Sequence, residues 1–595
     1  MSFGSDLVSS IASPVPITIT PPEDVEETPQ NEEIESWVPL VLLAASQAVM
    51  VLDATVMNVS LSSVMADIGI SVNTMQTALA AYTLFMASFM AAGASIVGRH
   101  TALYMLMGGL FAYGVGSAMT AAAQNFTVFF IGWCVLEGLG AVIVLPGIIS
   151  LVAGIYTAPT QRATAFGILG GVGGSAAAAG PIIGGLFTTY ASWRYVFVIE
   201  AILVVIIIVG LLANRAHILS KVPPPGPPTK SFDIIGTILL AISMGCLVFA
   251  ALNSSAWGIM KPLDSAPFTI GPFSPVIMLF CIAIVAWFQF LEYEDLAESW
   301  GTVDVLLASE AMNGTVISAL TSKMVLLFTI GSYFFLFPLY VQTVLGYDAL
   351  NTGMRLLPLS ISLFIASALA PRLQRHGHPR PWYRFSFVCI AIGLVGMALT
   401  ADEELSDGLV VLFHSFIGAG AGLLFGTVTN VLQSAVSTDA GRARMAGVEG
   451  TAHNLGNSLG TSVVGAVTLT RLTSAFVDNV VAEGSLDPAF VINITSTAVA
   501  EGLPFVPPAD AAAAFAEAYD LSEADLETVT DAYTGAMGVA LVSGVLTIIF
   551  VVVFGCGCAT QGLPHAKRTP LRSAARSEAR AHTGRKRADR RKQSV

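Results

Sequence analysis

Long apolar segments recur along the chain, separated by shorter polar connections. Each segment is roughly 17 to 30 residues long, which is enough for an α-helix to cross the hydrocarbon core of a bilayer. The pattern therefore predicts fourteen membrane-spanning helices. They cover residues 38–61, 75–97, 103–122, 127–153, 165–187, 195–213, 234–252, 275–291, 316–345, 353–373, 385–401, 409–436, 446–469 and 535–554.

Composition supports the same fold class. The 595 residues are 54% hydrophobic and only 11% charged, whereas soluble domains carry roughly 25% charged residues. We therefore predict an all-α polytopic membrane protein that lies in the lipid bilayer. The sequence contains no zinc-protease helix motif, nucleophile with a paired base, or phosphate-binding glycine loop. An enzyme is not expected, and no catalytic residue, cofactor, metal or nucleic-acid partner is predicted.

Basic residues gather in particular connections, and Lys and Arg accumulate on the cytoplasmic side of membranes. They are dense at 372–384 and in the tail after residue 558, which the fourteen-helix count places on one side. The connection at 292–310 falls on that side although it is acidic, but acidic residues weigh little in this rule. Both termini are predicted to be cytoplasmic. The Ala/Gly/Val-rich composition suits a plasma membrane of the bacterial inner type.

The basic connections after the second and tenth helices divide the chain into similar halves with two helices between them. Two six-helix bundles around a midplane cavity are a common design of alternating-access carriers. The predicted organisation is a disordered acidic leader (1–36), a six-helix bundle (37–213), a linker with two extra central helices (214–310), a second six-helix bundle (311–555) with an external insert (470–533), and a basic tail (556–595).

The fifth predicted helix contains the sequence GGVGGSAAAAGPIIGG at 170–185. Small residues let two helix backbones approach closely in lipid. A proline bends a membrane helix and is tolerated where neighbours or water satisfy the freed backbone group. Helix packing and gating are therefore predicted for Gly173, Gly180, Pro181, Gly184 and Gly185.

Three motifs carry a resemblance to a known family. They read LDATVMNVSL at 52–61, GPIIGG at 180–185 and SWRYVF at 192–197. Further matches follow at 232–236, 338–347, 353–358 and 455–460. In this order and spacing, the motifs resemble the fourteen-helix drug:proton antiporter branch of the major facilitator superfamily, of the multidrug efflux type. The resemblance implies export of organic compounds in exchange for protons.

Two motifs depart from the pattern of this family. The connection after the second helix reads GASIVGRH at 93–100 and lacks the family's Asp-Arg pair, so the charge clamp between helices is expected to be missing. In the fourth helix, the pattern Arg-x-x-Gln-Gly is replaced by CVLEG at 134–138, which removes an arginine and introduces Glu137. The resemblance alone therefore does not establish proton coupling.

Ionisable side chains at bilayer depth cost about 2.5 to 3.5 kcal/mol when charged, so each one needs a reason. Asp53 lies near the middle of the first helix, at the acidic position of the family motif, and is predicted to carry protons. The alternative is a packing carboxylate that neighbouring hydroxyls or amides satisfy. Glu137 is a second candidate, either as a proton carrier or to attract cationic substrates, and a neutral glutamate bonded to another helix is its alternative.

Four other ionisable positions need an explanation. Glu449 and His453 are four residues apart in the thirteenth helix and share a face, where a carboxylate and an imidazole can pass a proton. Local salt-bridge packing is the alternative for this pair. Lys323 is expected to extend toward the membrane surface. Arg162, before the fifth helix, is expected to be a gating or orientation charge.

Aromatic and polar side chains of the first, second and ninth helices are candidates for a cavity that accepts varied amphipathic compounds. These candidates are Asn58, Tyr82, Phe335, Tyr340 and Gln342. The leading prediction is a monomeric secondary transporter that exports small hydrophobic or amphipathic organic molecules by alternating access, with protons as the coupling ion. An uncoupled facilitator or a dedicated metabolite or lipid exporter is the first alternative. A non-transporting membrane scaffold or sensor is the second.

Overall fold

The computed structural model describes residues 35–559, with gaps at 223, 226–229, 263–265, 270, 308–311, 374–378, 401–405, 436–438, 484–485, 502–507 and 520. The predicted acidic leader and basic tail lie almost entirely outside the described residues, as does part of the basic connection at 372–384.

The first half of the chain forms six long helical segments and one short helix. The fourth segment changes from α-helix to π-helix and back. The elements are α2 (Val38–Ile68), α3 (Val72–Arg99), α4 (Ala102–Ala122), the continuous segment of α5 (Phe126–Phe129), π-helix η1 (Phe130–Glu137) and α6 (Gly138–Ile155), then α7 (Pro159–Tyr190), α8 (Arg194–Ala213) and the short α9 (Arg215–Lys221).

The linker and the second half follow the same helical plan. The linker contains β1 (Ser231–Phe232), α10 (Ile234–Trp257), α11 (Pro275–Trp300) and β2 (Val303–Asp304). The second half contains α12 (Gly314–Leu339) with π-helix η3 (Tyr340–Val344), α13 (Ala349–Leu373), α14 (Pro379–Leu399), α15 (Asp407–Ser434), α16 (Asp439–Ala482), α17 (Pro488–Glu501), α18 (Pro508–Ala518) and α19 (Glu523–Ala559).

Among the described residues, twelve helices are long and apolar enough to cross a membrane. Helices α7 and α16 stand where the fifth and thirteenth spans were predicted, but they are not among the twelve. The all-α fold of a polytopic membrane protein is therefore supported, and the count of fourteen spans stays a prediction.

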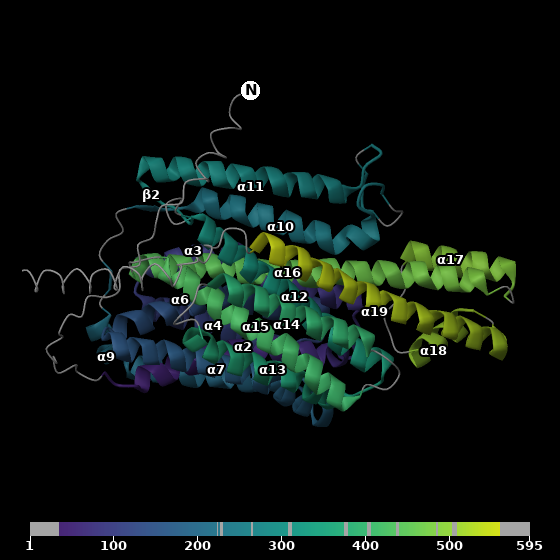
Figure 1. The fold of residues 1–595 in the computed structure, drawn as a ribbon, viewed down its shortest axis with the longest axis horizontal. Helices are drawn as coiled ribbons and strands as arrows, with labels where there is room; N and C mark the ends of the chain where they lie inside the picture. The colour runs from purple at the N-terminus through teal and green to yellow at the C-terminus, as the bar shows by residue number, and fades with distance from the viewer. Residues whose placement is uncertain are drawn as a thin grey trace, which may run out of the picture.

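The two extra helices are central in the sequence but lie at one edge of the bundle, with α10 between α11 and the other helices (Figure 1). Leu240, Met244 and Val248 recur every four residues on α10 and pack against small side chains of α3, including Ala80 and Ala87. The segments that flank the two helices pair as the short parallel strands β1 and β2. This pairing ties the start of α10 to the end of α11.

The two halves meet mainly along two helix pairs, α3 with α16 and α7 with α13. We call the face at which α2 and α12 begin the proximal face, and the face at which they end the distal face. Near the distal face, Gly185 of α7 packs against the backbone of Ala349 and Leu350 at the start of α13. A glycine thus allows the two halves to approach closely at the distal end of their interface.

The predicted insert at 470–533 continues the helical structure. Helices α16 and α19 have 44 and 37 residues, which corresponds to about 66 and 55 Å of helix against a hydrocarbon core of about 30 Å. Their extensions beyond the distal face lie beside α17 and α18 (Figure 1). Asn479 of α16 donates to the carbonyl of Ala532 in α19 at 2.9 Å, and Phe476 packs against Phe515 and Tyr533. The insert is a packed helical projection.

Candidate functional site

Three buried carboxylates from three helices meet inside the first half. They belong to Asp53 of α2, Glu137 at the end of η1 and Glu200 of α8, and one oxygen of each lies within 4.8 Å of the others. Asp53 and Glu137 are fully buried, and Glu200 is 4% exposed. We call these three side chains the carboxylate cluster. The structure thus brings together the two acidic candidates of the first half and adds a third.

The start of α8 explains why Glu200 reaches the cluster. The indole nitrogen of Trp193 donates to the Asp67 carboxylate at 2.9 Å, and Arg194 forms an ion pair with the same carboxylate. Because Asp67 lies near the end of α2, these contacts fix the first turn of α8 beside that helix. Glu200 follows Arg194 by less than two turns and faces into the bundle.

A close contact between two backbones explains the position of Glu137. A Cβ atom at Gly116 of α4 would lie 2.7 Å from the carbonyl oxygen of Gly132 in η1, and one at Gly132 would lie 2.9 Å from the carbonyl oxygen of Gly116. Only glycine permits this approach. The Glu137 side chain also packs directly on Gly116. Glu137 ends the π-helix η1, and π-helical turns inside α-helices are frequent at functional sites.

Hydrogen bonds satisfy only part of the cluster. The Trp133 indole donates to both oxygens of Asp53, at 3.1 and 3.3 Å. Thr120 donates to Glu137 at 3.2 Å, and Ser117 donates to Glu200 at 3.4 Å. Glu137 Oε2 and Glu200 Oε1 are buried and have no hydrogen-bond partner among the described residues.

Electrostatics disfavours simultaneous ionisation of the three carboxylates. None of them takes part in an ion pair within the described ranges of the chain. At an effective dielectric constant of about 20, two ionised carboxylates at this separation repel by roughly 3 to 4 kcal/mol. Carboxylate oxygens are suitable ligands for protons and hard cations. The cluster is therefore built to bind positive charge.

A cavity of about 150 Å³ lies between the two halves, next to the cluster. Its lining comes from α2, α3 and η1 on one side and from α12 and α16 on the other. The lining includes the predicted Asn58, Tyr82 and Phe335, together with Trp133, Phe334 and Asn457. Aromatic rings and carboxamides of this kind suit amphipathic organic molecules.

Trp133 connects the cavity to the cluster. Its ring lines the cavity and stacks on Tyr82, with the ring centroids 4.8 Å apart and the planes 3° apart. The other side of the ring system packs against Phe129, which in turn contacts Trp193. The same indole carries the N–H group that binds Asp53. A single side chain thus contacts both the cavity and the carboxylate cluster.

Two cavity candidates lie elsewhere. Tyr340 and Gln342 belong to π-helix η3 near the distal face and do not line the cavity. Gln342 instead donates to the carbonyl of Val59 at 3.0 Å and contacts Ser62, so that it joins α12 to α2. A contact of Tyr340 or Gln342 with substrate stays a prediction.

Lys323 lies inside the second half and is only 1% exposed, so the expectation that it extends toward the membrane surface is wrong. Its ammonium group lies 3.0 Å from Glu449 Oε1 and 3.2 Å from the centroid of the Phe425 ring. Thr429 donates to the same Glu449 oxygen at 2.5 Å. A buried carboxylate is an acceptable partner for a buried ammonium, which would otherwise remain unpaired.

Glu449 is therefore paired with Lys323 rather than with His453. The His453 ring packs edge-on against Phe425, with the ring centroids 6.2 Å apart. Within the described part of the chain, no hydrogen bond joins Glu449 to His453. The alternative of local salt-bridge packing fits this arrangement better than a proton path through the pair.

The glycine-rich helix α7 packs against both halves. Gly180 faces Thr55 of α2, Gly184 faces Val56 and Val59, and Gly173 faces Gln47. Pro181 is buried, and its carbonyl lies against Gly353 of α13, where a Cβ atom would collide with it. The small residues thus allow α2, α7 and α13 to approach closely, as the pattern predicted for packing. Their role in gating remains a prediction.

Arg162 binds the end of α6. Its guanidinium donates to the carbonyl oxygens of Tyr156 and Thr157, at 3.0 and 3.3 Å. A cation is favourable at a helix C-terminus, where the last carbonyls lack helical partners. The role that the contacts support is attachment of α7 to α6.

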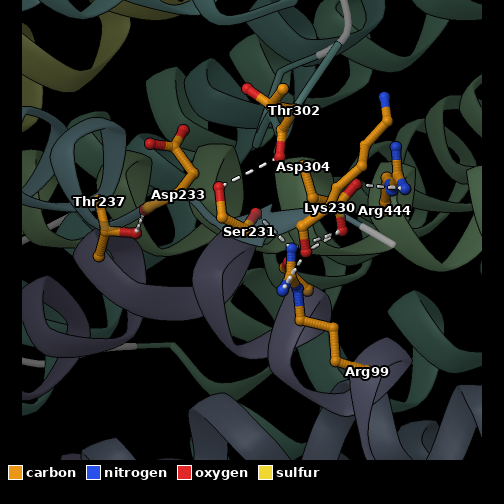
Figure 2. A network of polar contacts seen from close by, with 9 residues as sticks. Arg99, Lys230, Ser231, Asp233, Thr237, Thr302, Asp304 and Arg444 are labelled. Atoms are coloured by element: carbon orange, nitrogen blue, oxygen red, sulfur yellow. Dashed lines mark hydrogen bonds and ion pairs between the residues drawn. The ribbon is translucent and has the colours of Figure 1, made fainter. Parts of the chain in front are cut away.

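A charged junction lies at the proximal face, where both halves meet the linker (Figure 2). Arg99, the last residue of α3, donates to the carbonyl oxygens of Lys230 and Ser231. Its guanidinium lies 3.5 Å from the Asp304 carboxylate of β2, and Arg444 of α16 lies 2.6 Å from the same carboxylate. The expectation that the charge clamp is missing is therefore wrong, because Asp304 supplies from the linker the acid that the loop lacks.

Comparison with known proteins identifies the family. A family model described as Major Facilitator Superfamily matches residues 43–461. The chain belongs to the major facilitator superfamily. Membership in this superfamily confirms the prediction of a multi-pass membrane transporter rather than an enzyme.

Relatives within the superfamily include resistance proteins. The chain is 28% identical to a puromycin resistance protein of Streptomyces alboniger, over 78% of this chain and 87% of the relative. It is also 28% identical to a tetracenomycin C resistance and export protein of Streptomyces glaucescens, over 77% and 80% of the two chains. The structure of a bacterial homologue of the human lysosomal transporter Spinster, inward-facing and unoccupied, superposes with a TM-score of 0.53 at 15% identity, over 89% of this chain and 97% of that one. This last likeness concerns the fold.

Two residues of the transporter site were not predicted, Glu200 and Trp133. Glu200 follows the SWRYVF segment and is the only acidic residue between Arg194 and Asn214. The cost of a charge in the bilayer, which drew attention to Asp53 and Glu137, applies equally to it. Trp133 carries no such signal, since a tryptophan in an apolar helix more often packs in the core or faces lipid.

Proposed function

We propose that this superfamily member exports hydrophobic or amphipathic organic compounds by alternating access, and that proton entry through Asp53 drives the export. The names of two relatives, which concern resistance to puromycin and resistance to and export of tetracenomycin C, support a substrate of the antibiotic-like organic class. The aromatic cavity between the halves supports the same class. Its volume of about 150 Å³ is below the roughly 300 Å³ of a small ligand pocket, so binding requires the halves to separate.

The contact between Trp133 and Asp53 is the observation that carries the coupling. A compound that enters the cavity displaces or polarises the indole, and the indole stabilises the ionised form of Asp53. Protonation of Asp53 removes the charge that accepts these hydrogen bonds and frees the ring. Proton and substrate thus influence one another through a side chain that both of them touch.

The remaining features of the proposal concern the cellular setting. The transporter acts as a monomer in a plasma membrane of the bacterial type, with both termini and the proximal face on the cytoplasmic side and without nucleic-acid partners. The basic residues Arg99, Arg162 and Arg444 near the proximal face support this orientation, because cytoplasmic connections are rich in Lys and Arg.

Proteoliposomes that contain a pH-sensitive dye test the proposal. Ethidium, a lipophilic monovalent cation, is added to the purified transporter, and both ethidium movement and proton movement are followed. We expect ethidium-evoked proton movement in the wild type and its loss in Asp53→Asn. Asp295→Asn, which changes an exposed aspartate of α11, serves as the matched control and retains the wild-type signal. Ethidium movement without proton movement in the wild type would contradict the coupling.

A further inference from the structure

We infer that Asp53, Glu137 and Glu200 act as one site that carries two protons in each transport cycle, so that exchange of a monovalent cation is electrogenic. The inference rests on the proposed proton coupling and assigns Glu200, together with Glu137, to the coupling site. Two protons and three carboxylates leave the cluster with a single negative charge. This charge lies on Asp53 while the Trp133 indole donates to it. When substrate displaces the indole, a proton moves from a neighbouring glutamate to Asp53 and the charge moves to that glutamate.

The donors and acceptors of the cluster account for where the protons bind. Both oxygens of Asp53 already accept from Trp133, whereas Glu137 Oε2 and Glu200 Oε1 are buried without partners in the described residues. A proton on each glutamate turns these orphaned acceptors into donors, and the neighbouring acceptors are the Asp53 carboxylate for Glu137 and the Tyr113 hydroxyl for Glu200. Each glutamate keeps its second oxygen as an acceptor, for Thr120 or Ser117.

A fourth polar group, the hydroxyl of Tyr113, also supports proton binding at the cluster. The hydroxyl of Tyr113 in α4 is fully buried, interacts electrostatically with all three carboxylates, and lies close to Asp53 and Glu200. It is therefore available to accept a proton from a neutral carboxyl group or to donate to an ionised one. The other titratable neighbours are Tyr82 and Cys134, which are neutral when protonated and add no positive charge to balance the cluster.

The positions of the helices connect proton release from the cluster to movement of the cavity wall. Asp53, Glu137 and Glu200 come from α2, η1 and α8, and η1 is the segment that also forms the cavity wall through Trp133. A shift of η1 moves Glu137 relative to Asp53 and Glu200, which changes the separation of the charges and therefore the proton affinity of the coupled cluster.

Ethidium exchange at a fixed membrane potential tests the stoichiometry. Proteoliposomes loaded with ethidium receive an inside-negative potassium diffusion potential, and ethidium efflux in exchange for external protons is measured. Entry of two protons against exit of one monovalent cation moves one net positive charge inward, so we expect the potential to accelerate wild-type exchange about tenfold. In Glu200→Gln one proton exchanges for one cation, and we expect the acceleration to disappear while exchange continues.

Two further variants control the experiment. Glu137→Gln removes one of the two protons, as Glu200→Gln does, and should also abolish the dependence of exchange on the membrane potential. It provides the same test if Glu200→Gln fails to fold. Glu292→Gln changes a glutamate on the exposed side of α11 and should behave as the wild type. Proton-coupled but potential-independent exchange in the wild type would overturn the inference and leave the proposed function intact.

Infrared difference spectroscopy of the purified transporter at neutral pH adds a measurement that does not need transport. We expect the carbonyl bands of two buried protonated carboxyl groups in the wild type, and the loss of one band in each glutamine variant. Unchanged bands in both variants would overturn the inference even if proton-coupled transport is present. Absence of ethidium-evoked proton movement in every sample would instead overturn the proposed function, while the infrared bands still decide whether the cluster holds two protons.

Discussion

The indole nitrogen of Trp133 donates to both carboxylate oxygens of Asp53, at 3.1 and 3.3 Å, while the ring of Trp133 lines the cavity between the two halves. A hydrogen bond to a charged group contributes roughly 1.5 to 3 kcal/mol. Its strength changes with the protonation of Asp53, and the position of the ring changes with the occupancy of the cavity.

The first prediction concerns this contact. Trp133→Phe keeps an aromatic ring on Tyr82 but removes the N–H donor, so ethidium-evoked proton movement should fall about tenfold or more, as expected for loss of about 1.4 kcal/mol. Ethidium binding, measured by fluorescence titration, should weaken much less. Trp287→Phe on α11 is the control, because Trp287 is 37% exposed and remote from the cluster in sequence. Equal losses of binding and proton movement would show that the ring only shapes the cavity.

A second prediction concerns the buried pair of Lys323 and Glu449. Lys323→Met leaves the Glu449 carboxylate unpaired in the interior, so the free energy of unfolding should fall by about 3 to 5 kcal/mol. The double variant Lys323→Met with Glu449→Gln removes both charges and should recover most of this loss. Denaturant unfolding in detergent micelles measures the wild type, the two single variants Lys323→Met and Glu449→Gln, and the double variant. Additive effects of the two substitutions would mean that the pair does not act as a unit.

The contact between α7 and α13 gives a third prediction. A Cβ atom at Gly185 would lie 2.7 Å from the carbonyl oxygen of Ala349 and from Cα of Leu350, so Gly185→Ala should separate the two helices at the distal face. We expect ethidium exchange to slow several-fold. The distance between spin labels at the exposed positions Leu186 and Met354, measured by double electron–electron resonance, should increase.

Gly98→Ala is the matched control for this prediction. Gly98 also lies in a membrane helix, but a Cβ atom added at this position would meet no neighbouring atom within 4 Å. Alanine favours helix over glycine by about 1 kcal/mol, so this variant should be at least as stable as the wild type and should keep its exchange rate. The same slowing in both variants would exclude a specific role for the distal contact.

The fourth prediction concerns the junction at the proximal face. Asp304→Asn removes the charge that Arg99 and Arg444 share, and two like-charged guanidinium groups then face one another. Backbone amides in the last turn of α3 and in α16 near Arg444 should exchange with deuterium faster, because the ends of these helices separate more often. The control variant Asp407→Asn breaks the ion pair between Asp407 and Arg355. Because the Asp407 side chain is 80% exposed, this loss should change the rate of deuterium exchange little. Protection that is unchanged in Asp304→Asn would mean that the backbone contacts of Arg99 alone hold the junction.

Much of the fold follows from local properties of the sequence. The apolar segments predicted twelve of the described membrane helices, and the small residues around Pro181 predicted the tight contacts of α7. Asp53 and Glu137 were predicted to be inside the bundle because a charge at bilayer depth is costly, and both are fully buried. Such properties need no knowledge of which helices are neighbours.

The partners of these residues depend on how helices rotate and tilt against one another, which the sequence does not state. Glu449 was paired with His453 because both lie on one helix face, yet Lys323 approaches it from α12, 126 residues earlier in the chain. Asp304 reaches Arg99 only because α10 and α11 return the linker to the proximal face. The π-helix η1 carries both Trp133, which lines the cavity, and Glu137, which belongs to the carboxylate cluster. Its position depends on the contact of Gly132 with Gly116 of the neighbouring helix α4.

The helical projection formed by the long ends of α16 and α19 with α17 and α18 has a practical consequence. A transporter of this size that is hidden within a detergent belt offers few features for aligning single-particle images. Here an asymmetric, packed element is joined without interruption to two helices of the second half, and it projects beyond the distal face (Figure 1). It therefore serves as a built-in landmark for image alignment, and as an epitope through which antibody fragments can be attached without touching the cavity.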